Sequence, residues 1–156
     1  MNSLESLRKI YRYNTWANSR AIDSLRQMTD HSAKALRALS HLVLAEREWL
    51  SRLHTSIDST GFNDWQELSL DECEALNVEN QQRFKALLDG IDEDGLDSIA
   101  IYKNTQGIEY HTPFRDILLH VSFHSAYHRG QLASAVRAED GTPISTDFIF
   151  FQRQAD

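Results

Sequence analysis

The sequence is poor in cysteine, proline and glycine, and it has no long apolar run. Its 156 residues include one cysteine, two prolines and six glycines. A single cysteine, Cys73, cannot form a disulfide within the chain. No apolar run approaches about 18 residues, and the first residues lack the apolar core of a signal peptide. These absences predict a cytoplasmic protein with no membrane partner.

Positive charge is also scarce. The chain has 23 acidic and 16 basic residues, a formal net charge of -7, and no cluster of lysine and arginine. Because nucleic-acid binding depends largely on neutralising phosphates, we expect no nucleic-acid partner. With 41% hydrophobic residues, the chain is long enough for one substantial core and short for two. We therefore predict a single domain over residues 1–156.

Apolar residues recur at helical spacing along most of the chain, and capping residues mark where helices begin. Asn2 with Glu5, and Ser69 with Glu72, have the spacing of capping boxes, and Ser32 is a candidate N-cap between them. The three helices predicted from these caps end at about Met28, Leu53 and Gly90.

A short alternating segment, SIAIYKNTQGIEYHT, interrupts the helical pattern and predicts a β-hairpin. After it, Thr112 and Pro113 suit an N-cap and a first-turn proline. The fourth predicted helix runs to about Ala138, where Gly141 and Pro143 end it. We therefore predict an all-α fold, a four-helix bundle with a short β-hairpin insertion before the last long helix. The interior of such a bundle is a usual place for a metal or cofactor.

Three histidines lie four residues apart in LLHVSFHSAYHRGQL, residues 118–132. Residues four apart stack on one face of a helix, so His120, His124 and His128 form a column. His124 and His128 fall inside the apolar arc of this helix, whereas His120 falls at its edge. His120 and His128 start about 12 Å apart, so a pair four apart is the unit that can bind one ion. Histidines hydrogen-bonded at the edge of a core remain the alternative.

A third ligand has to come from another helix, and spacing alone does not choose it. The candidates are His31, His41, His54 and His111. The segment HSAYH lacks the glutamate of the HExxH metalloproteases. No Glu-x-x-His occurs in the chain, which argues against a carboxylate-bridged di-iron bundle.

Three segments together carry a resemblance to a known family: YNTWANSR, HLVLAEREWLSRL and HVSFHSAYHRGQL. The chain resembles the DinB family of four-helix-bundle proteins, and its tail GTPISTDFIFF also fits. The resemblance implies a metal held by one histidine of the second helix and two of the last. Those positions match His41, His124 and His128. Three imidazoles suit zinc or nickel and leave a fourth position open for water or substrate, as in catalytic zinc sites.

Relatives in the wider superfamily use such a site in thiol transfer and isomerisation. The resemblance therefore implies a metal-dependent transferase, isomerase or hydrolase that acts on a small-molecule thiol or electrophile. Two alternatives stay open: a metal-binding stress-response or regulatory protein without turnover, and a helical interaction module with incidental histidines. The apolar FIFF tail predicts packing on the bundle or at a homodimer interface.

Several other residues have two interpretations. Glu48 could orient a ligand or form a surface salt bridge, and Tyr127 and His120 could support a metal ligand or pack at the edge of the core. Gly130 inside a helix suggests close approach of a neighbouring helix, near Ala17. The remaining predictions are core positions for Trp16 and Trp49 and a buried, inert thiol for Cys73.

Overall fold

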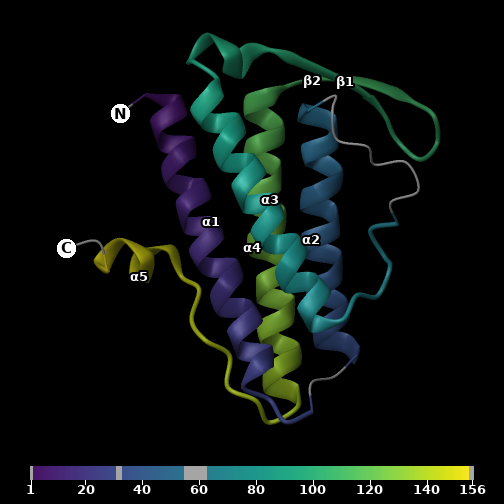
Figure 1. Ribbon diagram of the computed structural model, residues 1–156, viewed down its shortest axis with the longest axis vertical. Helices are drawn as coiled ribbons and strands as arrows, with labels where there is room; N and C mark the ends of the chain where they lie inside the picture. The colour runs from purple at the N-terminus through teal and green to yellow at the C-terminus, as the bar shows by residue number, and fades with distance from the viewer. Residues whose placement is uncertain (1, 31–32, 55–62, 155–156) are drawn as a thin grey trace.

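Four long helices form a bundle in the computed structural model, which describes residues 2–30, 33–54 and 63–154 (Figure 1). The bundle helices are α1 (Ser3–Arg26), α2 (Ala33–Leu53), α3 (Leu70–Gly90) and α4 (Phe114–Ala138). Between α3 and α4 lie a 3-10 turn, η1 (Asp94–Asp97), and an antiparallel hairpin of β1 (Ile99–Lys103) and β2 (Glu109–Pro113). A short helix, α5 (Phe148–Arg153), follows the bundle. The predicted all-α bundle with a hairpin insertion is confirmed.

The helices do not follow a simple up-and-down order. α1 and α4 run in one direction, whereas α2 and α3 run in the other (Figure 1). α1 and α2 each pack against both α3 and α4, so α1 and α2 lie at opposite corners of the bundle. α2 and α4 are therefore neighbours, although the chain between them contains a whole helix and the hairpin. Within the described residues, no helix is long and apolar enough to cross a lipid bilayer.

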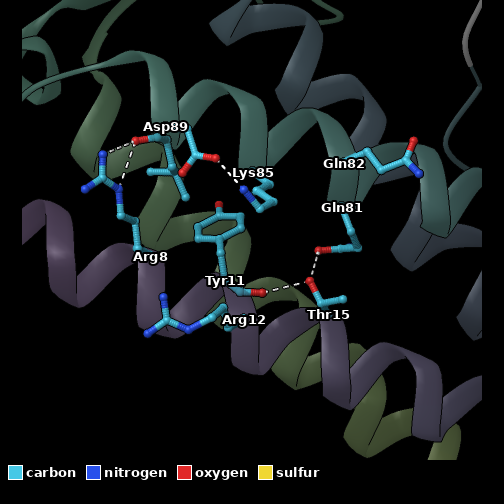
Figure 2. Close-up of a pocket in the computed structure, with 9 residues that line it drawn as sticks. Arg8, Tyr11, Arg12, Thr15, Gln81, Gln82, Lys85 and Asp89 are labelled. Atoms are coloured by element: carbon cyan, nitrogen blue, oxygen red, sulfur yellow. Dashed lines mark hydrogen bonds and ion pairs between the residues drawn. The ribbon is translucent and has the colours of Figure 1, made fainter.

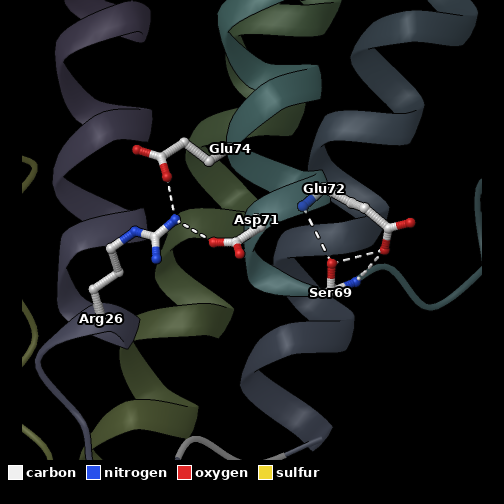
Figure 3. Close-up of polar contacts among 5 residues, drawn as sticks. All are labelled: Arg26, Ser69, Asp71, Glu72 and Glu74. Carbon is white, nitrogen blue, oxygen red and sulfur yellow. Dashed lines mark hydrogen bonds and ion pairs between the residues drawn. The ribbon is translucent and has the colours of Figure 1, made fainter.

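Side-chain caps set the starts of α1 and α3. The Asn2 side chain accepts a hydrogen bond from the Glu5 amide at 2.8 Å. Ser69 and Glu72 form the full predicted capping box, in which each backbone amide donates to the other side chain (Figure 3). These bonds satisfy amides that the first helical turn leaves unpaired. The other predicted cap, Ser32, lies outside the described residues.

An ion pair then joins the end of α1 to the start of α3. The Arg26 guanidinium bonds to the carboxylates of Asp71, at 2.9 Å, and Glu74 (Figure 3). α1 ends at Arg26, two residues before the predicted end. The cation at the C-terminus of one helix and the carboxylates in the first turns of the other both complement the helix dipoles.

The prediction for the start of α4 was wrong. Thr112 and Pro113 belong to β2, and the helix begins at Phe114. Thr112 shares a hydrogen bond with the Tyr102 hydroxyl at 3.1 Å instead of capping the helix. The Phe114 amide donates to the Ser98 carbonyl at 2.9 Å, so the hairpin and not a side-chain cap anchors this end. The signal was ambiguous because a proline suits both a strand end and a first helical turn.

A polar layer divides the core into two apolar clusters. One cluster, next to the hairpin, contains Leu7, Leu50, Phe84, Ile117 and Val121 among others. The second, at the other end of the bundle, contains Leu25, Leu39, Cys73, Leu132 and Val136 among others. Between them along all four helices lie buried polar residues: Asn14, Asn18, Glu46, Asn77, Gln81, Ser125 and Arg129. We call these seven residues the polar layer.

The expectation that Gly130 admits a neighbouring helix was also wrong. Gly130 is exposed, and a Cβ added there would meet no atom within 4 Å. Gly141, just after α4, has no room for a side chain. Its amide donates to the Val136 carbonyl at 2.9 Å while Asp140 adopts a φ of 60°, which together form a Schellman-type helix end. A Cβ at Gly141 would lie 2.8 Å from a Val136 methyl group.

Alanine at these two glycines should therefore have opposite effects. Gly130→Ala should raise the free energy of unfolding by about 1 kcal/mol, because alanine favours an exposed helix interior. Gly141→Ala should lower it by about 1–3 kcal/mol through the clash with Val136. Urea unfolding followed by circular dichroism measures both changes. A Gly141→Ala protein as stable as the wild type would contradict this account of the helix end.

The segment after α4 runs along α1 and is tied to it by hydrogen bonds. The Tyr13 hydroxyl donates to the Thr146 carbonyl at 2.9 Å, and Arg20 Nε donates to the Ser145 carbonyl at 2.7 Å. Trp16 lies under α5, against the ring of Phe151, and so is partly covered by the tail instead of lying in the bundle core. Trp49 is likewise partly buried, against the edge of the core. The tail thus packs on α1, and the homodimer stays a prediction.

Candidate metal centre

Three histidine rings from two helices meet on the side of the bundle where α2 and α4 pack together. They belong to His41 on α2 and to His124 and His128 on α4. One ring nitrogen of each lies within 4.8 Å of those of the other two. The Nε2 atoms of His124 and His128 are 3.1 Å apart. Among the described residues, this is the group of histidine, cysteine, aspartate and glutamate side chains whose spacing suits a metal ion.

Hydrogen bonds orient two of these rings so that Nε2 faces the centre. His41 Nδ1 lies 2.8 Å from the Asp64 carbonyl, and His128 Nδ1 lies 2.8 Å from the Gln131 amide oxygen. Both partners only accept, so each Nδ1 must carry the proton and each Nε2 must keep its lone pair. His128 Nε2 then accepts from His124 Nε2, whose proton a metal ion would replace.

The donor set and its spacing fit a four-coordinate divalent ion. Two ligands that bind a tetrahedral ion at about 2.1 Å lie roughly 3.4 Å apart. The 3.1 Å separation of the His124 and His128 nitrogens is close to that value. When bound, such an ion would act as a Lewis acid and would lower the pKa of a coordinated water or thiol. His124 is less buried than the other two histidines, so the centre faces outward on its side.

The surroundings keep the rings of α4 uncharged. Burial, with the neighbouring His128, His41 and His120, lowers the pKa of His124 to about 4. Burial and His41 also lower the pKa of His128, although the bond to Gln131 opposes this. Both rings are therefore neutral near pH 7, and neutral imidazole is the form that binds a metal. Acid must charge buried rings here, so the metal-free fold loses stability as pH falls from 6.5 toward 4.

A comparison with protein-family models matches residues 1–156 to the model described as DinB family. The chain belongs to the DinB family. A search of curated proteins found no match. Membership of this family and the three-histidine group that the structure forms from α2 and α4 are compatible with metal binding.

The described histidines His54 and His111 of this DinB chain are not part of the group. His111 is exposed on β2, where its Nε2 is 2.9 Å from a Glu109 carboxylate oxygen. His54 follows the end of α2, and His31 lies outside the described residues. Of the candidates for a third ligand, the structure brings His41 to the α4 pair. Cys73 is buried beside Ser40, and burial raises the pKa of its thiol, as expected of an inert cysteine.

Trp65 packs on the His41 side of the centre, a contact that sequence patterns did not predict. Its ring stacks on His41 with centroids 4.1 Å apart and planes 15° apart, although 64% of the residue is exposed. The adjacent Asp64 supplies the carbonyl that holds His41 Nδ1. The described part of the loop before α3 thus fixes the His41 ring from two directions. No helical periodicity could reveal a contact between a loop and a helix.

His120, the third member of the column, lies outside the group. It is exposed, and its ring centroid lies 5.6 Å from that of His124 and 4.8 Å from that of Trp49. Burial and the nearby Arg52 lower its pKa. Glu48 forms a salt bridge with Arg52 at 2.5 Å, so of its two interpretations the structure supports the salt bridge.

Tyr127 contacts the centre through its ring. It packs edge to face on His128 with centroids 5.2 Å apart, and 65% of the residue is exposed. This contact is edge packing, and the structure gives no hydrogen bond between Tyr127 and a histidine of the centre among the described residues. The hydrogen-bonding support for His128 comes from Gln131, one helical turn further along α4.

Inside the bundle, the polar layer lies directly behind these ligands. The Glu46 carboxylate accepts hydrogen bonds from Asn14, Asn18, Ser125 and Gln81 at 2.7–3.1 Å. Glu46 is 1% exposed, so its charge is removed from water. These bonds join α2 to the other three helices at one level.

Arg129 supplies the opposite charge in the polar layer. Its Nη1 donates to the side-chain oxygens of Asn14 and Asn18, at 2.6 and 2.7 Å, and the residue is 2% exposed. Asn14 and Asn18 thus connect the cation to the Glu46 carboxylate without a direct ion pair. Ser125 and Arg129 immediately follow His124 and His128 in α4. The polar layer therefore fixes the rotation of α4 that turns both histidines toward α2.

Proposed function

We propose that this DinB-family protein binds one divalent metal ion, zinc or nickel, through Nε2 of His41, His124 and His128. The observation that carries the proposal is the convergence of one ring nitrogen from each histidine, with Nδ1 of two rings already held by oxygen acceptors. Oriented neutral imidazoles of this kind are good ligands for both ions. Three protein ligands leave a fourth position for water or substrate, which is how catalytic zinc sites are built.

Metal analysis of protein purified without an affinity tag tests this proposal. We expect about one divalent ion per chain, and removal by a chelator should lower the melting temperature, because the ion binds only the folded centre. Readdition of zinc or nickel should restore it. Protein that holds no stoichiometric metal after reconstitution would leave the helical interaction module as the function.

We propose further that the centre is catalytic and acts on a small-molecule thiol or electrophile. The outward-facing His124 side supports access for a substrate. A bound ion would stabilise a thiolate near neutral pH, which is the reactive form of a thiol. The test is turnover of candidate thiols with electrophiles by metal-loaded protein, with metal-stripped protein as the control. Stoichiometric metal without metal-dependent turnover would favour the non-catalytic stress-response or regulatory protein.

A further inference from the structure

A cavity lies between α1 and α3, on helices that contribute no ligand to the histidine centre (Figure 2). Its volume is about 390 Å³. This is within the range of roughly 300–1,000 Å³ that is usual for small-molecule sites. The proposed metal chemistry does not use this cavity, so it does not explain the residues that line it.

The floor of this α1–α3 cavity is apolar or already hydrogen-bonded. Tyr11 and Leu88 are 4% and 2% exposed, and the Tyr11 hydroxyl donates to the Leu118 carbonyl inside the bundle. The Gln81 amide accepts from Thr15 and donates to Glu46, so both its ends are occupied. The floor therefore offers few free polar groups, and the cavity surface as a whole is mostly apolar, which suits an apolar molecular body.

The rim of the cavity is positively charged in a chain whose net charge is -7. Its charged residues are Arg8, Arg12, Lys85 and Asp89. Lys85 is paired with Asp89 at 2.5 Å, so these two charges offset each other. Arg8 uses Nε and Nη2 to bond the Leu88 carbonyl. Lys85 and, to a smaller degree, Arg8 lower the pKa of the Asp89 carboxyl, so one carboxylate faces three cations on this rim.

Arg12 is the cation with the most freedom to bind. Within the part of the chain that the structure describes, it forms no hydrogen bond or ion pair, and Figure 2 draws it without a dashed line. It lies one helical turn from Arg8 on α1, so the two guanidinium groups border the same side of the cavity. Guanidinium groups bind carboxylates and phosphates through paired N–H donors.

We propose that the α1–α3 cavity binds a small amphipathic anion, with its apolar body over Tyr11 and Leu88 and its carboxylate or phosphate at Arg12 and Arg8. The rim has three cations and one carboxylate, so an anion here offsets a net positive charge. The apolar body covers the carbon floor between the helices. This site is separate from the metal centre, and the proposal does not depend on whether the protein is an enzyme.

Amide chemical-shift mapping on the isotope-labelled full chain tests the site. The probes are octanoate, octyl phosphate, octanol and octylamine, which share one apolar chain and differ in the head group. At least one anion should bind saturably, with a Kd below about 10 mM, and should shift amides of α1 and α3 near Arg12 and Lys85. It should bind at least about tenfold more tightly than octanol. Whichever of octanoate and octyl phosphate binds more tightly shows whether the site prefers a carboxylate or a phosphate.

Two matched variants separate the cavity from general charge effects. Arg12→Gln should weaken binding of the anion by about tenfold or more, because it removes the unpaired guanidinium. Lys103→Gln also removes one positive charge, from an exposed residue of β1, and should leave the affinity for the anion within about twofold of the wild-type value. The proposal is overturned if neither anion binds, if octanol or octylamine binds as tightly, or if Arg12→Gln has no effect. Shifts confined to α4 around His124 would instead place the anion on the metal centre and would also overturn it.

Discussion

Replacing Arg129 by methionine should lower the free energy of unfolding by about 3–5 kcal/mol. Methionine fills similar space but removes the cation that faces Glu46 through Asn14 and Asn18. Glu46 is 1% exposed, so its charge would stay buried without a compensating charge, and two asparagine oxygens would lose their donors. Urea unfolding at pH 7, followed by circular dichroism, measures the loss.

The control is an arginine on the surface. Arg83→Met breaks the exposed pair of Arg83 with Glu79 and should cost no more than about 1 kcal/mol. The double variant Glu46→Gln, Arg129→Met should be more stable than the sum of the two single losses predicts, because both buried charges are then gone. An Arg129→Met protein no less stable than Arg83→Met would show that the polar layer does not hold the bundle together.

Substituting alanine for any one histidine of the centre should abolish stoichiometric metal. His41→Ala, His124→Ala and His128→Ala each remove a nitrogen that faces the others within 4.8 Å, and two remaining ligands bind an ion weakly. His120→Ala should leave most of the metal, because its ring contacts Trp49 and lies outside the group. The measurement is metal content per chain, with circular dichroism to verify that each variant folds.

Substitution of Gln131 should weaken metal binding without abolishing it, and the same measurement of metal content tests this. Gln131→Ala removes the acceptor that holds His128 Nδ1, and loss of such a partner usually weakens metal binding by about 10–100-fold without removing the site. His111→Ala, which removes an exposed histidine on β2, serves as the matched control. If His120→Ala empties the centre while His128→Ala leaves it full, the ligand pair on α4 is His120 with His124 and the proposed set is incorrect.

Local signals in the sequence predicted most of the helices but not how they pack. Ser69 with Glu72 marked the start of α3 because a capping box is made by residues three apart. The apolar arc of the last long helix predicted the buried face of α4, and the apolar residues Ile117, Val121 and Leu132 are buried there. The start of α4 failed because Phe114 is held by Ser98, a contact that belongs to the hairpin and that no local pattern encodes.

In the histidine centre, too, local spacing could be predicted from the sequence and contacts between distant segments could not. The spacing of His124 and His128 placed both on one helical face, whereas His41 came from the family resemblance and not from spacing. Asp64 and Trp65 reach His41 from a loop, so the sequence could not connect them to it. Glu46 could have been noticed, since it occupies a core position in step with Leu39, Leu42 and Leu50, and a charge at such a position requires partners.

The helix order has a consequence for synthesis on the ribosome. The neighbours of α1 are α3 and α4, so the helix made next, α2, cannot cover its apolar face. About 112 residues separate the end of α1 at Arg26 from the end of α4 at Ala138. At roughly 5–20 residues per second, their synthesis takes about 5–20 s. For that time the nascent α1 has an incomplete set of partners, and apolar surface left exposed in this way is prone to aggregation.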